Sequence, residues 1–219
     1  MPQTSETYYK ADFWSEENLK YAQPHFRMEK VARLVNRIAR GRECDLLDVG
    51  CGPATLRQLL HNNVDYYGID IAIHRPAANL IQTDFVESPI KFGEKKFDIV
   101  LAQGVFEYIG RVQAQKFSEI AQLLKAEGRF IVSYVNFDHR STYMYWPYNN
   151  VQSFADFHQS LKQHFHVRRF IPTSHRWHHD EPRARLTKAI QMRINLNIPF
   201  ITRRLAVEYF FICSPRKSG

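Results

Sequence analysis

Leu46-Leu47-Asp48-Val49-Gly50-Cys51-Gly52-Pro53-Ala54 decides the fold, because an apolar run ends there in an acidic residue and a glycine-rich turn. A buried strand of a parallel sheet is continuously apolar, and the chain then turns sharply into a helix whose N–H groups face a polar ligand. Gly50 and Gly52 permit backbone angles that other residues avoid and leave room for a ligand. We therefore predict the first strand of an α/β sheet, with a nucleotide-type cofactor beside it.

The residues after this turn indicate which cofactor fits. A dinucleotide fingerprint reads Gly-x-Gly-x-x-Gly or ends in Ala, whereas the last position counted from Gly50 is Thr55. A pyrophosphate ligand is thus disfavoured. A ligand without phosphates that carries an adenosine and an amino acid fits better, and S-adenosylmethionine is such a ligand.

Carboxylates follow the next two predicted strands. Tyr66-Tyr67-Gly68-Ile69-Asp70 predicts a strand that ends in an acid 22 positions after Asp48, close to the ~20 expected for a ribose-binding carboxylate. Asn79 to Phe85 predicts a third short strand, whose Asp84 and Phe85 are candidate adenine contacts. Lys96 to Gly104 predicts a fourth strand, which would lie beside the first in a doubly wound sheet.

With these motifs the sequence resembles the class I, seven-stranded, Rossmann-like S-adenosylmethionine-dependent methyltransferases over roughly Val31 to Val135. The resemblance implies that the family's Asp/Glu-x-Gly-x-Gly motif falls on Asp48, Gly50 and Gly52, its ribose ligand on Asp70, its adenine-side acid on Asp84 and its fourth-strand segment on Phe97 to Tyr108. One departure is the connection from Ile71 to Ala78, which is shorter than the usual crossover of ~10–12 residues, so a minimal helix or a loop is expected there. The predicted cofactor-binding residues are Asp48, Gly50, Cys51, Gly52, Asp70, Ile71, Asp84, Phe85 and Gln103, and no metal ligands are predicted.

The remaining elements alternate as a parallel sheet requires. Apolar residues at helical spacing predict helices over residues 28–39 and from Phe117 to Gly128, and further strands are predicted over residues 129–135, 167–171 and 207–213. The predicted fold is α/β: a doubly wound, mostly parallel, seven-stranded sheet with helices on both faces and an antiparallel last strand. We expect one domain over residues 1–219, with a lid segment at 1–26, a cofactor-binding core at 27–135, and substrate-side insertions and final strands at 136–219.

Composition narrows the class of protein. The three cysteines, Cys44, Cys51 and Cys213, lack metal-ligand spacing and are expected to be reduced. No run approaches the ~18 apolar residues of a membrane span, so a cytoplasmic protein is predicted. From Lys162 onward there are 12 Lys/Arg and 3 Asp/Glu, a net charge of +9, whereas the preceding residues have a net charge of −1.

Four segments compete for the acceptor side of the site: residues 8–14, residues 106–108, residues 136–139 with the aromatic stretch 143–148, and residues 174–180. The candidate catalytic residues are His139 and His175 as general bases, with Tyr108 and Glu107 after the fourth strand. Residues 175–180 also contain His175, His178, His179 and Asp180. Their spacing alone does not bring these side chains together around a metal ion, so a pocket wall is favoured over a metal site.

The predicted partner is a small, apolar or aromatic acceptor molecule. An Asn/Asp-Pro-Pro-Tyr/Phe motif, typical of base-amino methyltransferases, is absent, since Gln103-Gly104-Val105-Phe106 occupies that place. One alternative is an RNA or protein methyltransferase that docks through the basic C-terminal quarter, in which case nucleic acid remains a possible partner. The other alternative is a non-catalytic cofactor-binding protein.

Overall fold

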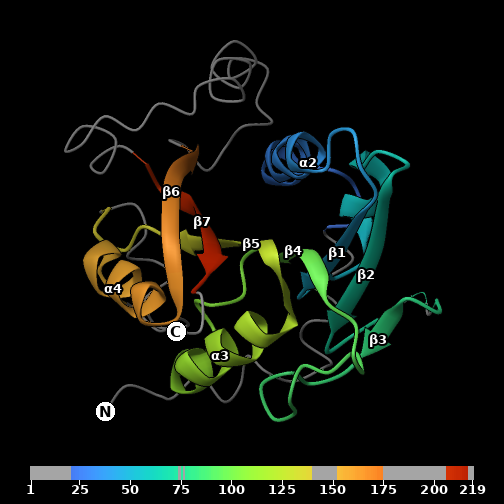
Figure 1. Ribbon diagram of the computed structural model, residues 1–219. Coiled ribbons are helices and arrows are strands. Elements are labelled where there is room, and N and C mark those ends of the chain that lie inside the picture. Colours follow the sequence, from blue (N-terminus) through green and yellow to red (C-terminus); the bar gives the residue numbers. More distant parts are fainter. Residues whose placement is uncertain (1–20, 74, 76, 140–151, 175–205, 217–219) are drawn as a thin grey trace, which may run out of the picture.

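The computed structural model describes residues 21–73, 75, 77–139, 152–174 and 206–216. A seven-stranded sheet in the order β3-β2-β1-β4-β5-β7-β6 forms its centre (Figure 1). Strand β7 runs antiparallel to both of its neighbours, β5 and β6, which confirms the predicted antiparallel last strand. The strands are β1 (Cys44–Val49), β2 (Val64–Asp70), β3 (Leu80–Gln82), β4 (Phe97–Ala102), β5 (Leu124–Val135), β6 (Phe165–Ser174) and β7 (Glu208–Pro215).

The sheet is doubly wound about β1. Strand β1 pairs in parallel with β2 on one side and with β4 on the other. The chain therefore builds outward to β3, returns to the far side of β1 and continues to β4 and β5. Ligands of such sheets bind beyond the carboxyl ends of the strands where this direction reverses, here at β1 and β4.

Successive residues of the central strands point to opposite faces, and a separate apolar core lies on each face. Leu46 packs with helix α2 (Phe26–Ile38) on one face, whereas Leu47 belongs to the cluster that includes helices α3 (Gln113–Leu123) and α4 (Phe154–His164) on the other. Figure 1 shows α2 on one side of the sheet and α3 and α4 on the opposite side. This arrangement confirms the helices predicted on both faces.

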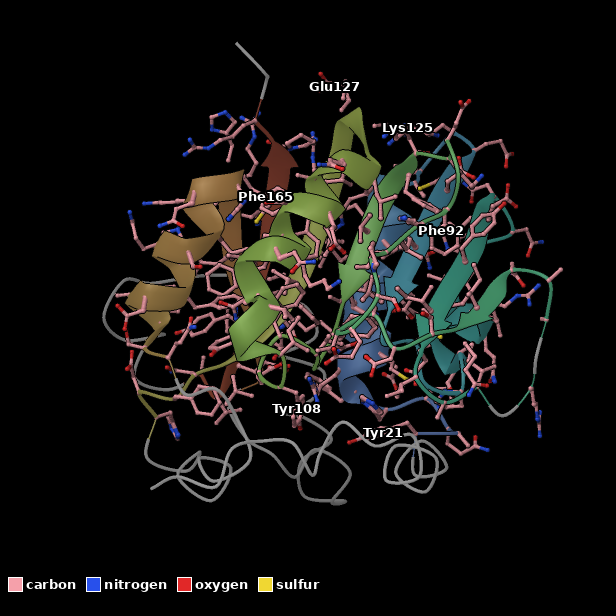
Figure 2. All side chains as sticks on the ribbon, turned by 90° about the horizontal axis from the view of Figure 1, so that it is seen from below. Tyr21, Phe92, Tyr108, Lys125, Glu127 and Phe165 are labelled. Carbon is pink, nitrogen blue, oxygen red and sulfur yellow. The ribbon has the colours of Figure 1, made fainter. Side chains whose placement is uncertain are left out.

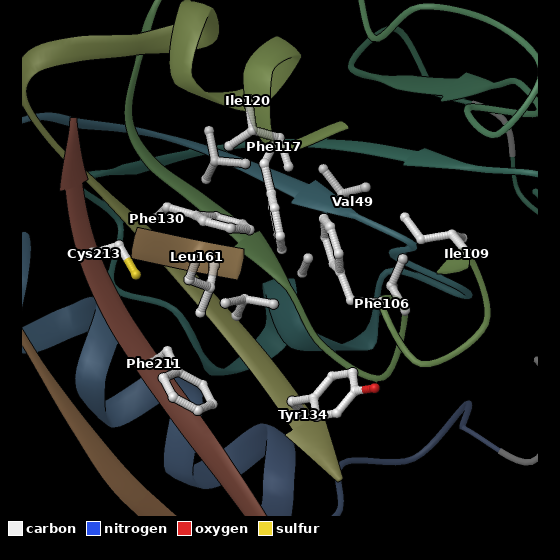
Figure 3. Close-up of a cluster of buried hydrophobic side chains, with 14 of the residues drawn as sticks. Val49, Phe106, Ile109, Phe117, Ile120, Phe130, Tyr134, Leu161, Phe211 and Cys213 are labelled. Carbon is white, nitrogen blue, oxygen red and sulfur yellow. The ribbon is translucent and has the colours of Figure 1, made fainter. Parts of the chain in front are cut away.

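Aromatic packing under α3 fixes the segment that follows β4. Phe106 stacks on Phe117 of α3 with ring centroids 4.6 Å apart, and both rings contact Phe130 of β5 edge to face (Figure 3). Tyr134 stacks on Phe157 of α4 at 3.7 Å. Because interiors are close-packed, these contacts hold the chain after β4 in one position against the sheet.

Several elements differ from the sequence-based predictions. The glycine-rich turn leads into a short 3-10 helix, η2 (Thr55–Leu59), rather than an α-helix, and a further 3-10 turn, η3 (Gly110–Val112), precedes α3. Strand β3 covers only the middle of the predicted Asn79–Phe85 strand. Helix α4 was not predicted. Between β2 and β3 the described residues form no helix, as the short connection indicated.

No helix among the described residues is both long enough and apolar enough to span a membrane.

Candidate active site

A cavity opens at the carboxyl ends of β1, β2 and β4. All nine sequence-predicted cofactor-binding residues line it, namely Asp48, Gly50, Cys51, Gly52, Asp70, Ile71, Asp84, Phe85 and Gln103. Its wall also includes Tyr21 and Tyr108, which Figure 2 shows at one end of the sheet, opposite Lys125 and Glu127. The strand order places Asp84 and Phe85 at one end of the cavity, the glycine turn in the middle and Gln103 toward the other end.

The glycine turn after β1 is locked onto β2. Gly50 has φ +74°, and a Cβ added there would lie 2.4 Å from Cγ2 of Val105, so this position accepts only glycine without a shift. The backbone N–H groups of Gly50 and Cys51 both donate to the carbonyl of Ile69, at 2.8 and 3.1 Å. The turn is therefore a fixed floor for a ligand.

Asp70 connects the two loops that follow β1 and β2. Its Oδ2 accepts the Gly52 N–H at 2.8 Å, and its Oδ1 accepts the Ala72 N–H at 2.9 Å. The side chain is buried but borders the cavity. Because each carboxylate oxygen can accept more than one hydrogen bond, Asp70 can still receive donors from a ligand.

Asp48, at the end of β1, has a partner that the sequence analysis missed. The Tyr66 hydroxyl of β2 donates to Asp48 Oδ2 at 2.7 Å, and both side chains are buried. Burial raises the pKa of Asp48 to about 7, although the Tyr66 hydrogen bond opposes this shift. The available signal was periodicity: Gly68 pairs with Asp48 across the two strands, so Tyr66, two residues earlier, lies on the same face of the sheet.

The loop after β3 brings Asp84 and Phe85 to the same end of the cavity as Asp70. The Thr83 N–H donates to the Asp70 carbonyl at 2.8 Å, which continues the pairing of the two strands. Asp84 Oδ1 accepts the N–H of Val86 at 2.9 Å and so shapes its own loop. The Phe85 ring is buried at the cavity wall, where it offers an apolar surface to a flat ligand.

The opposite end of the cavity is formed by the segment after β4 and by residues before and within α2. Gln103 Nε2 is buried and has no hydrogen-bond partner among the described residues. Tyr21 and His25, which fall in the predicted lid segment at 1–26, line the cavity as an edge-to-face ring pair with centroids 5.6 Å apart. The Thr55 hydroxyl donates to the Tyr21 carbonyl at 2.7 Å, so this pair is anchored beside the glycine turn.

The sequence-predicted catalytic residues are only partly brought together. Tyr108 lines the cavity. Glu107 does not line it, contrary to expectation, because its side chain turns into the protein, where Oε1 accepts the Val135 N–H at 3.0 Å. His139 is half-buried and also does not line it; its N–H donates to the Asn136 carbonyl and closes a turn over residues 136–139.

Several residues from the sequence analysis cannot be compared with the cavity. His175, His178, His179, Asp180, residues 8–14 and the aromatic stretch 143–148 lie outside the described residues. Among the described residues, no group of His, Cys, Asp and Glu has the arrangement of a metal site. Asp98, which is not among the predicted site residues, accepts hydrogen bonds from Arg42, Lys125 and the Asp45 N–H at the amino ends of the strands.

The donors and acceptors of the cavity fit an adenosyl amino acid. Asp70 and Asp84 suit the hydroxyl and amine donors of adenosine, and Asp48 suits an ammonium group. Gly50 and Gly52, both at positive φ, have no side chains, so a ligand can approach the backbone of the cavity floor at these two positions. Gln103 adds a buried donor that has no protein partner among the described residues.

Comparisons with known proteins agree with this arrangement. A family model described as a methyltransferase domain matches residues 24–175. No curated protein matches the sequence significantly.

Solved structures of similar fold include several S-adenosylmethionine-dependent methyltransferases. A TehB-like enzyme from Corynebacterium glutamicum has a TM-score of 0.56 at 16% identity and covers 97% of this chain and 98% of its own. An enzyme from Clostridium acetobutylicum has a TM-score of 0.59 at 10% identity, covering 88% and 92%. The plantazolicin methyltransferase BpumL, in complex with a triazolic desmethylPZN analogue and S-adenosylhomocysteine, has a TM-score of 0.60 at 15% identity, covering 93% and 90%.

Proposed function

Because the chain belongs to the methyltransferase-domain family and is an S-adenosylmethionine-dependent methyltransferase, we propose that its acceptor is a small, apolar or aromatic metabolite. The observation that carries this proposal is the part of the cavity wall that the nine predicted cofactor-binding residues do not form. There Tyr21, Met28 and Tyr108 offer apolar and aromatic surface. Sites for small molecules are mostly apolar with a few placed polar groups. A protein of similar fold, BpumL, was crystallised with a triazolic desmethylPZN analogue, which supports an acceptor of this kind.

The nine predicted residues divide into contacts for three parts of the cofactor in this proposal. Asp70 accepts hydrogen bonds from the ribose hydroxyls, and Ile71 covers the ribose and adenine edge. Asp84 and Phe85 contact the adenine through a carboxylate and an apolar ring. The methionine part lies over Asp48, Gly50, Cys51 and Gly52, with the backbone of Gln103 toward the amino group.

The bound cofactor supplies a methyl group on a positively charged sulfur, which an acceptor atom displaces in line. Most of what the protein contributes is then alignment and exclusion of water. Tyr21 and His25 close one wall over the glycine turn. Of the predicted catalytic residues that the structure describes, Tyr108 is the one that lines the cavity, so we assign to Tyr108 the contact with the acceptor.

Where the structure describes the basic C-terminal quarter, its lysine and arginine residues lie away from the cavity. The described basic residues of the C-terminal quarter include Lys162, Arg168 and Arg216, at the end of α4, the first half of β6 and the end of β7. Because β6 runs in the same direction as β1 and β4, these residues lie toward the amino ends of the parallel strands. A polyanion docked there would sit at the opposite end of the sheet from the cavity.

Transfer of a labelled methyl group from S-adenosylmethionine tests the proposal. Purified protein is incubated with panels of small aromatic and azole acceptors, with total RNA and with a protein mixture, and the Asp70→Ala variant is the control for site dependence. Label found only in small acceptors supports the proposal. Label in RNA or protein alone contradicts it, and cofactor binding without transfer to any panel favours the non-catalytic alternative.

A further inference from the structure

His25 stands at the position where helix α2 begins, but its side chain does not cap the helix. Its backbone is extended, with φ −125° and ψ 170°, and its carbonyl accepts the Glu29 N–H at 3.0 Å, as the residue that starts a helix should. Ser, Thr, Asp or Asn is preferred at this position, because a short polar side chain bonds the free N–H groups of the first turn. The His25 side chain makes no such bond. Departures from a local preference are expected at functional sites.

The His25 ring forms part of the cavity wall. Met28, three residues further along the chain, also lines the cavity, so both side chains come from one face of the first turn of α2. The Tyr21 ring packs against the His25 ring, and the Thr55 hydroxyl holds the Tyr21 carbonyl. The imidazole therefore lies among the aromatic and apolar side chains that we assign to the acceptor.

The other ionisable side chains of the cavity wall are less suited to take a proton from an acceptor. Among the described residues they are Tyr21, Arg27, Asp48, Cys51, Asp70, Asp84 and Tyr108. The arginine and the two tyrosine hydroxyls keep their protons near neutral pH, and burial raises the pKa of the Cys51 thiol. The three carboxylates already accept hydrogen bonds from protein groups and are assigned to the cofactor. Histidine is the side chain that ordinarily gains and loses a proton near neutral pH.

We propose that His25 is the general base of the reaction and that the acceptor atom is the oxygen of an aromatic hydroxyl group. A hydroxyl oxygen becomes a good nucleophile only as its proton leaves, whereas an amine or a ring nitrogen attacks through a lone pair that it already has. A base within an aromatic wall therefore fits a phenol best. This inference rests on the small acceptor proposed above, and it names the chemical class of that acceptor.

The reaction balances with His25 as the only protein group that changes its protonation state. The hydroxyl oxygen bonds to the methyl carbon as the bond from that carbon to sulfur breaks, and the electron pair of the broken bond stays on sulfur. The hydroxyl proton passes to the uncharged imidazole ring. The products are a methyl ether and S-adenosylhomocysteine. The His25 ring is half-buried rather than fully enclosed, so its proton can then pass to water.

Two phenols of different acidity test whether His25 takes a proton. At pH 8, para-cresol keeps its hydroxyl proton, whereas para-nitrophenol has largely lost its proton and needs no base. Transfer of a labelled methyl group from S-adenosylmethionine is measured for both phenols with the unchanged protein and with His25→Asn. We expect the variant to methylate para-cresol about 10²- to 10⁴-fold more slowly, the usual contribution of a general base. Its rate with para-nitrophenol should fall far less, because no proton has to leave.

Two further measurements separate proton transfer from folding and from cofactor binding. Asparagine is a preferred residue at the start of a helix, so His25→Asn should unfold at the same temperature as the unchanged protein or at a higher one. In calorimetric titration, its affinity for S-adenosylhomocysteine should stay within about twofold, because no cofactor contact is assigned to His25. His61→Gln is the matched control, since it removes an exposed histidine just before β2, at the opposite end of the sheet, and should change none of these quantities.

Each other outcome overturns the assignment in a recognisable way. Equal losses of rate for the two phenols would show that His25 does not act by taking a proton, and unchanged rates would remove His25 from the reaction. A weaker affinity for S-adenosylhomocysteine would assign His25 to the cofactor instead. If the unchanged protein labels neither phenol but labels other small acceptors, the proposed function stands and the roles of His25 and of a hydroxyl acceptor are wrong. If it labels no small acceptor, the proposed function fails and the role of His25 falls with it.

Discussion

At the scale of single residues, Asp70 combines a structural role with the binding role that we propose for it. It fixes the Gly52 and Ala72 N–H groups and faces the cavity. We expect Asp70→Ala to weaken S-adenosylhomocysteine by about 1.5–3 kcal/mol, the usual cost of losing hydrogen bonds to a charged group. Titration calorimetry measures this loss, with Asp70→Asn as the variant that preserves shape and one acceptor. Unchanged affinity in both variants would remove Asp70 from the site.

Asp48 leads to a prediction about the pH dependence of cofactor affinity. Burial raises the pKa of Asp48 to about 7, so its carboxyl group is largely protonated at pH 6 and largely ionised at pH 8. A ligand ammonium favours the ionised form. We therefore expect S-adenosylhomocysteine affinity to rise from pH 6 to pH 8, by up to about tenfold, since one pH unit corresponds to about 1.36 kcal/mol.

The control for this pH effect is Asp48→Asn, which cannot ionise. Titrations of both proteins across the same pH range should give a rising affinity for the unchanged protein and a flat profile for the variant. The same slope in the two proteins would assign the titration to another group.

At the scale of elements, α3 holds the loop that carries Asp84 and Phe85, the proposed adenine contacts. Lys116 is fully buried, and its ammonium donates to the Ser88 carbonyl at 2.8 Å and to both oxygens of Glu119. Glu119 in turn accepts the Ile90 N–H at 3.0 Å. These bonds fasten the connection between β3 and β4, including Asp84 and Phe85, to the helix.

We expect Lys116→Met to lower the free energy of unfolding by about 1–3 kcal/mol, because it leaves buried partners without their donor. The looser loop should also weaken 5′-methylthioadenosine, which contacts only the adenosyl end, by several-fold. Urea unfolding and titration measure the two effects, and Gln122→Ala, at an exposed position of α3, is the matched control. A loss of stability with unchanged affinity would show that the hydrogen bonds of Lys116 stabilise the fold but do not position the binding site.

The elements that the sequence predicted well are those with a local signal. The apolar run before Gly50 and the acids at 48, 70 and 84 were sufficient to select residues that line one cavity. Helix α4 was missed although Ser153 caps it by accepting the Asp156 N–H, a Ser-x-x-Asp signal with apolar residues at 154, 157 and 161. Tyr66 could not be placed, because its contact is with a partner on another strand, Asp48. Strand pairing sets such contacts, and local sequence does not.

At the scale of the whole molecule, the pKa values of carboxyl groups are shifted in opposite directions at the two ends of the sheet. At the amino ends, burial alone would raise the pKa of Asp98, but hydrogen bonds from Lys125 and the Asp45 N–H lower it below its ordinary value. At the carboxyl ends, burial raises the pKa of Asp48 and of Glu107 to about 7, and Glu208 adds to the shift of Glu107. At the amino ends of the strands, Asp98 therefore stays ionised to lower pH. At the carboxyl ends, beside the cavity, burial favours the protonated form of Asp48 and Glu107.

This asymmetry predicts how stability depends on pH. A carboxyl group whose pKa is raised on folding stabilises the protein below its unfolded pKa of about 4, and that contribution is lost as pH rises through about 7. Acids with lowered pKa values, such as Asp98, lose their contribution only when pH falls below about 4. We therefore expect the free energy of unfolding, measured without ligand, to fall between pH 5 and pH 8.

Glu107 offers the sharpest test of that slope, because its Oε2 is buried without a hydrogen-bond partner among the described residues. Ionising Glu107 in the folded protein should cost about 3 kcal/mol, because its pKa of about 7 lies well above the ordinary value for a glutamate. In urea unfolding, Glu107→Gln should match the unchanged protein at pH 5 and exceed it in stability at pH 8, while Asp65→Asn, at an exposed position, should follow the unchanged protein at both. Identical slopes for Glu107→Gln and the unchanged protein would show that Glu107 does not titrate in this range. A free energy of unfolding that rises toward pH 8 would contradict the prediction that raised carboxyl pKa values at the cavity end dominate the pH dependence.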